Sequence, residues 1–193
     1  MIVMDPVDRE SGYDMGRPTA DIVTVSSAAK VSHANTRGIR GEFTILDAPG
    51  EYEIRGVQLM GVATRPPRVE GEPLGERNTI FVVEAEDLRV AHLGGLGWRM
   101  SPDQAEQLGE IDVLIIPIGG TPVLDAAEAA RLVREIDPKV VIPMHYTPDE
   151  NDLPPQDFIK AVGATPEAPT NRASIQRRGL SENTRLVVLQ PRG

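Results

Sequence analysis

A histidine and a tyrosine stand at the end of a buried strand that the sequence predicts in the second half of the chain. Val140, Val141 and Ile142 form a short apolar run, and His145 and Tyr146 follow it. Ligands of α/β proteins collect just beyond the carboxyl ends of the strands, so these two side chains stand where a site is expected. The imidazole of His145 can serve as a metal ligand or a catalytic base. The structural alternative is a histidine that hydrogen bonds simply hold in place.

Any metal site would depend on few side chains, because the chain has three histidines and no cysteine. A metal would then be held by histidines and carboxylates, and catalytic zinc ordinarily takes three protein ligands. His92 lies inside a predicted strand, which favours a structural role. His33 lies in a polar segment, which favours a solvent-exposed loop position.

A βαβ unit is expected to position His145. Residues 113–118 form a continuous apolar run of strand length, which is typical of a strand buried on both faces. Asp125 can cap the helix that follows, with Glu128 three residues on as in a capping box. Pro138 ends this helix, because proline cannot continue the hydrogen-bond ladder. Residues 140–142 then begin the second buried strand.

The rest of the chain predicts hairpins with short helices between them. Residues 42–46 and 51–63 are expected to form an antiparallel pair, and residues 79–84 and 88–93 a hairpin around an acidic turn. Ser101 is a good helix cap with proline after it. This grouping favours a layered α/β sandwich over a doubly wound parallel sheet. Further elements are expected at residues 1–4, 21–25, 156–162 and 184–189.

Length and composition favour a single globular domain over residues 1–193, because the chain has 193 residues, of which 40% are hydrophobic. The net charge of −9 and the lack of a basic cluster argue against nucleic acid as a partner. No apolar run approaches the roughly 18 residues of a membrane span, and the N-terminus lacks the features of a secretory signal. We therefore expect no membrane contact and a cytoplasmic location.

Seven ordered segments resemble a known family. They are DIVTV followed by a serine, PGEYEI, NTIFVVE, HLGGLGW, DVLIIPIGG, LDAAEAARLV and VVIPMHY. Together they resemble the metallo-β-lactamase fold, in a branch of short bacterial proteins similar to the ascorbate-6-phosphate lactonases. The resemblance runs from about Met4 to Leu189. It implies a four-layer αββα sandwich, with a site of one or two metal ions at the sandwich edge. In such a site a metal-bound water attacks an ester, lactone or phosphodiester.

The metal ligands of that family are largely replaced in this chain. Where the family carries a His-x-His-x-Asp-His motif, residues 27–32 read SAAKVS, and His33 fits the last histidine only if one residue is inserted. The family's HLGD motif ends here in Gly95. His145 matches the remaining ligand position, and Asp5 and Glu51 are carboxylates at family motif positions near the expected site mouth.

Two functions follow from the resemblance. The first is a protein with a degenerate metal site that binds a small molecule or a protein partner without catalysis, with no cofactor. The alternative is a metal-dependent hydrolase of esters, lactones or phosphodiesters with one weakly held Zn or Mn ion. In that case the metal candidates are His145 and His33, and the catalytic candidates are His145, Asp5 and Glu51. Whether the chain is an enzyme stays open at this point.

The N-terminus also differs from the family pattern. Family members open with a strand hairpin before the Asp-Pro element, which is Asp5 and Pro6 here, whereas this sequence begins on what resembles the last strand of that hairpin. Either the start is mis-assigned or one sheet is short by an edge strand. The first strand would then be an exposed sheet edge, which invites pairing with another chain. We therefore expect a homodimer.

Overall fold

The computed structural model describes residues 1–8, 11–27, 34–68, 70–71, 75–148 and 153–190. A small sheet has three parallel strands in the order β1-β2-β3. These strands are β1 (Ile2–Met4), β2 (Ile22–Thr24) and β3 (Thr44–Leu46). A 3-10 helix, η3 (Thr36–Gly38), lies between β2 and β3.

A larger sheet has seven strands in the order β10-β9-β8-β7-β6-β5-β4. Neighbours are antiparallel from β4 to β7 and parallel from β7 to β10. Its strands are β4 (Gly50–Ile54), β5 (Val57–Thr64), β6 (Asn78–Ala85), β7 (Leu88–His92), β8 (Val113–Pro117), β9 (Val140–Met144) and β10 (Arg185–Leu186). Because β7, β8 and β9 are parallel, their carboxyl ends lie at one edge of the sheet.

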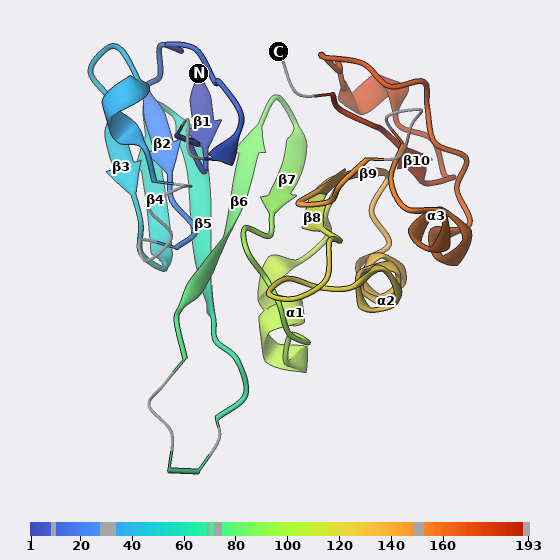
Figure 1. Ribbon diagram of the computed structural model, residues 1–193. Helices are drawn as coiled ribbons and strands as arrows, with labels where there is room; N and C mark the ends of the chain where they lie inside the picture. The colour runs from blue at the N-terminus through green and yellow to red at the C-terminus, as the bar shows by residue number, and fades with distance from the viewer. Residues whose placement is uncertain (9–10, 28–33, 69, 72–74, 149–152, 191–193) are drawn as a thin grey trace.

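The two sheets pack face to face, and the helices cover the other side of the larger sheet (Figure 1). Between the sheets, Ile22 and Leu46 meet Phe81 and Val83. The main core lies on the helix side and includes Leu114 and the buried face of α2. The helices are α1 (Pro102–Leu108), α2 (Ala126–Ile136) and α3 (Gln156–Val162). On the outer face of the small sheet the described residues form loops and the short helix η3, so the helical layer is thin on that face.

The C-terminal segment covers the rest of the inner face of the larger sheet. Ala173, Ile175 and Leu180 pack against a cluster that includes Val140 and Val187. A second 3-10 helix, η4 (Arg177–Gly179), lies within this segment. The last strand is shorter than the sequence predicts, since regular pairing covers only β10, and an isolated bridge joins Thr170 to Leu189. Within the described ranges no helix is long and apolar enough to span a membrane.

The helix boundaries confirm the local signals in the sequence. The Ser101 side chain accepts from Gln104 N in a capping box, with proline at the first helical position. Asp125 Oδ1 accepts from Glu128 N at 2.8 Å and so caps α2. The helix ends at Asp137, whose φ of 52° is left-handed. The predicted βαβ unit therefore holds, with β9 leading to His145.

The expected antiparallel pair of residues 42–46 and 51–63 is wrong. Residues 44–46 belong to the small sheet, where Ile45 pairs with Val23 in parallel. Residues 51–63 instead bend at Arg55 and Gly56 into the hairpin of β4 and β5. Both bend residues have positive φ, at 52° and 77°, as in the turns that suit tight hairpins. The misinterpretation came from treating the Arg-Gly turn as part of one long strand.

Candidate functional site

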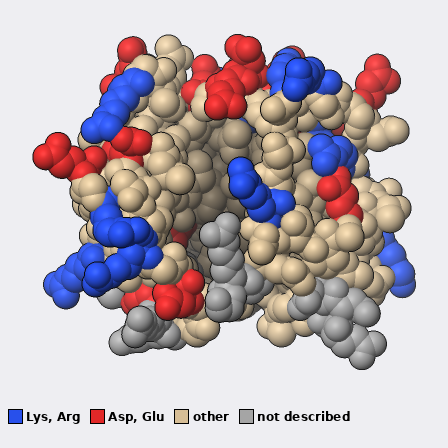
Figure 2. All heavy atoms as spheres, turned by 90° about the horizontal axis from the view of Figure 1, so that it is seen from above, with Lys and Arg blue, Asp and Glu red and all other residues tan. Residues whose placement is uncertain are grey.

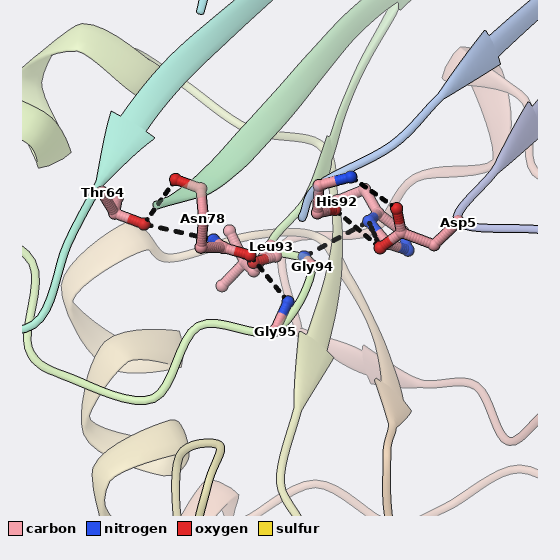
Figure 3. Close-up of polar contacts among 8 residues, drawn as sticks. Asp5, Thr64, Asn78, His92, Leu93, Gly94 and Gly95 are labelled. Carbon is pink, nitrogen blue, oxygen red and sulfur yellow. Dashed lines mark hydrogen bonds and ion pairs between the residues drawn. The ribbon is translucent and has the colours of Figure 1, made fainter. Parts of the chain in front are cut away.

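A buried polar cluster lies where the end of β2 meets the larger sheet (Figure 3). Both carboxylate oxygens of Asp5 accept hydrogen bonds from Ser26. Ser26 N donates to Oδ1 and Ser26 Oγ donates to Oδ2, each at 2.6 Å. The Asp5 backbone has a left-handed φ of 45°, which an aspartate tolerates better than most residues. Asp5 thus anchors the chain as it leaves β2.

His92 ends β7 beside this carboxylate. Its side chain is 8% exposed, and Nδ1 lies 3.8 Å from Asp5 Oδ2. Gly94 N donates to the same Nδ1 at 3.3 Å, which requires that nitrogen to be an acceptor in the neutral ring. This geometry agrees with the structural role expected for His92. An ion pair with Asp5 would form only on protonation.

Asn78 holds the turn that follows β7, and the sequence analysis did not single it out. Its Nδ2 donates to Thr64 Oγ1 at 3.1 Å and to Leu93 O at 3.0 Å, and Gly95 N donates to its Oδ1 at 2.8 Å. The residue is 3% exposed, so these bonds lie away from solvent. A signal for this role was present, because an asparagine at the start of a strand that carries the apolar run 80–83 must find buried partners.

Gly94 allows the cluster to close. Its φ is 58°, and a Cβ at this position would lie 2.3 Å from both Cβ and Oγ of Ser26 and 2.6 Å from Asn78 Oδ1. The glycine therefore serves both a left-handed turn and a close approach between the two sheets. A backbone bond from Thr79 N to Ser26 O, at 2.8 Å, joins the sheets at the same place.

Two threonine hydroxyls complete the polar interior near the cluster. Thr24 and Thr79 are fully buried, and neither Oγ1 has a hydrogen-bond partner among the residues that the structure describes. Alternation along β2 and β6 points both side chains to the space between the sheets, on the same faces as Ile22 and Phe81. Buried hydroxyls without protein partners are usual sites for ordered water.

His145 lies at the end of β9, as the sequence predicts. Its φ of 55° is left-handed, which is uncommon for histidine and often marks a functional site. Its carbonyl oxygen would lie 1.8 Å from a Cβ added to Gly119, so the position two residues after β8 must be a glycine for the chain after β9 to adopt this conformation. The residue is partly exposed.

The other candidates fall in different places. Glu51 lies on β4 and lines a hollow on the helix side of the sheet, and among the described residues it makes no hydrogen bond to the Asp5 cluster. His33 lies outside the described residues. The structure therefore brings Asp5 and His92 together and leaves Glu51 apart from them.

The described side chains that could bind a metal ion do not form a complete site. Within the described residues no group of three or more His, Asp or Glu side chains is placed to hold a metal ion. Asp5 is engaged by Ser26, and Gly95 offers no ligand. The described residues thus do not complete a catalytic metal site, and further ligands would have to come from outside the described ranges.

Comparison with known proteins gives clear relationships. A family model for the β-lactamase superfamily domain matches residues 1–145. A UPF0173 protein of Pyrococcus furiosus is 37% identical over 113 residues, which cover 58% of this chain and 49% of that protein. A UPF0173 metal-dependent hydrolase of Staphylothermus marinus is 37% identical over 98 residues, covering 49% of this chain and 40% of that protein. The chain thus spans about half the length of these relatives. Their sources extend beyond the bacterial branch expected from the sequence.

Solved structures agree with this relationship. A Thermotoga maritima protein, described as a Zn-dependent hydrolase of the metallo-β-lactamase superfamily, has a TM-score of 0.77 and 34% identity, with 97% of this chain and 89% of that chain covered. A Parabacteroides distasonis protein has a TM-score of 0.60 at 20% identity, which supports the fold alone. The metallo-β-lactamase sandwich predicted from the sequence is confirmed.

One expectation from the sequence is overturned by these comparisons. The replaced ligand motif led us to expect no cofactor, yet relatives from Staphylothermus marinus and Natranaerobius thermophilus are named metal-dependent hydrolases, and the Thermotoga maritima protein is described as zinc-dependent. The loss of motif residues was therefore given too much weight, because a motif compared position by position does not show which other side chains surround a metal.

Proposed function

Because the chain belongs to the β-lactamase superfamily, we propose that it is a metal-dependent hydrolase that cleaves an ester, lactone or phosphodiester bond. The observation that carries the proposal is the likeness to the Thermotoga maritima protein, at 34% identity over nearly all of both chains. The relatives named metal-dependent hydrolases support it. We expect one weakly held ion, Zn or Mn.

His145, Asp5 and His92, which we call the strand-end residues, take different parts in this proposal. His145 suits a ligand or base, because it follows β9 at the edge where β7 and β8 also end and is open to solvent. Asp5 suits a positioning role, since Ser26 occupies both of its oxygens. His92 lies behind Asp5 and is almost fully buried. We assign no reaction step to the metal, because the described residues do not complete its ligand set.

The test combines metal analysis with turnover. Protein purified without chelator is titrated with manganese and zinc and assayed on a lactone, a thioester and bis-p-nitrophenyl phosphate. Turnover that needs added metal and is lost in His145→Ala supports the proposal. Gln58→Ala is the control, because Gln58 is exposed on β5 and lines the hollow on the helix side of the sheet. No metal binding and no turnover on any of the three substrates would contradict it.

A second candidate is a ligand- or partner-binding protein without catalysis. The observation that favours it is the pair of replaced positions inside the described ranges, Ser27 and Gly95, where the resemblance leads one to expect a histidine and an aspartate. Metal bound in stoichiometric amount without turnover, together with a shift in melting temperature on ligand addition, would favour this candidate.

A further inference from the structure

Part of the helix-side face of the larger sheet is not covered by a helix. Figure 1 shows the three helices gathered over the β7, β8 and β9 side. Strand register places two rows of side chains on the uncovered face. One row runs Glu53, Gln58, Glu84 and Arg89 across β4 to β7. The next row runs Glu51, Met60, Val82 and Ala91, and only its first two residues are uncovered, because Val82 and Ala91 are buried in the main core. Four of these side chains, Glu51, Glu53, Gln58 and Glu84, are exposed.

This face is concave. One hollow of about 470 Å³ lies over β4 to β7, and a second of about 780 Å³ continues toward the β6–β7 turn and the segment after α1. The two share Gln58, Glu84 and Arg89, so they form one trough, which we call the acidic trough. Figure 2 looks onto the end of the molecule that carries the β6–β7 turn and shows a hollowed centre with both acidic and basic side chains around it.

The acidic trough carries a large charge excess. Its lining has seven carboxylates and two arginines, which gives a net charge of −5, against −9 for the whole chain. Both arginines are already paired, Arg89 with Glu84 and Arg177 with Asp112. Among the described residues, the remaining five carboxylates have no ion pair; they are Glu51, Glu53, Glu86, Asp87 and Glu110.

The arrangement of these carboxylates selects the kind of partner. They are spread along the trough, and no three of the described acidic or histidine side chains are placed to hold one metal ion. Distributed charge suits a partner with several cations at intervals. Met60 is partly exposed beside Glu51 and offers apolar surface to the aliphatic stem of a lysine or arginine.

We propose that the acidic trough is a docking surface for an extended, lysine- and arginine-rich segment of a partner protein. An extended segment presents every second side chain to one face, which matches Glu51 and Glu53, two residues apart on one face of β4. Its cations pair with the five free carboxylates, and steering by the net negative charge speeds the encounter. The proposal is independent of the hydrolase activity, because it involves none of the strand-end residues.

The test measures binding of a fluorescein-labelled peptide of alternating arginine and alanine by fluorescence anisotropy. The double variant Glu51→Gln/Glu53→Gln removes two carboxylates of the trough and is expected to weaken binding roughly three- to tenfold, the range for two exposed ion pairs. The control, Glu106→Gln/Glu182→Gln, makes the same change in net charge at exposed positions that do not line the trough. It is expected to bind like the unmodified chain.

Each alternative result is decisive. Equal weakening in the two double variants would show that only net charge matters, and absence of peptide binding at low salt would also overturn the proposal. Displacement of the peptide by spermidine at a concentration near the peptide's own Kd would assign the trough to small cations instead of a protein segment. Binding that falls with added salt is required, because exposed charges are screened. Circular dichroism confirms that both variants are folded.

Discussion

Replacing Asn78 with alanine tests whether the buried polar cluster holds the two sheets together. The substitution removes three side-chain hydrogen bonds, to Thr64 Oγ1, Leu93 O and Gly95 N. It also leaves the carbonyl of Leu93 without this donor and the amide of Gly95 without its acceptor. Thr64 keeps its own bond to the backbone carbonyl of residue 78.

The magnitude follows from these bonds. A hydrogen bond contributes about 1 kcal/mol net, so three give about 3 kcal/mol, and buried groups left unsatisfied add about 1 kcal/mol or more. We therefore expect Asn78→Ala to lower the free energy of unfolding by roughly 3 to 4 kcal/mol. Such a loss is a large part of the roughly 5 to 15 kcal/mol that stabilises a typical domain.

Urea unfolding followed by circular dichroism measures this loss. Asn183→Ala is the matched control, because Asn183 is exposed and its substitution should change the free energy of unfolding by less than about 0.5 kcal/mol. A loss below about 1 kcal/mol for Asn78→Ala would refute the reasoning, since it would mean that water replaces the bonds without cost.

Three further predictions concern neighbouring features. Gly94→Ala should destabilise the fold by more than about 3 kcal/mol, because its φ is 58° and the new Cβ would meet Ser26, whereas Gly179→Ala, with nothing within 4 Å, should be nearly neutral by thermal unfolding. Asp5→Ala should cost roughly 3 to 6 kcal/mol, from two hydrogen bonds to a charged group, and Asp5→Asn clearly less; equal losses in urea unfolding would contradict this account. We also propose a homodimer paired through the apolar edge strand β1, which light scattering checks; a monomer mass would exclude it.

Elements with local signals were predictable from the sequence. The cap at Ser101, the cap at Asp125 and the end of the helix before Pro138 each depend on residues within a few positions, and all three are present. The same holds for the β6–β7 hairpin, whose turn residues Glu86 and Asp87 both have positive φ. Such features need no knowledge of the tertiary structure.

Features that depend on distant residues were not predictable. Thr44–Leu46 pairs with β2, about twenty residues upstream, and nothing in its alternation distinguishes that partner from β4. Asn78 binds residues 14 and 17 positions away, so its role becomes visible only when β5, β6 and the turn after β7 are placed together. Metal binding could not be predicted from the local motif for the same reason, because metal ligands come together from distant positions and a linear motif contains only some of them.

The parallel small sheet has a consequence for the order of folding. Its three strands are joined by long connections, over residues 5–21 and 25–43, so each pairing must close a long loop. The β6–β7 hairpin closes over a two-residue turn and can form first. The strands of the small sheet should therefore be late to gain fixed partners, because they need the apolar surface that Phe81 and Val83 present. During synthesis these strands are the part of the chain most exposed to aggregation.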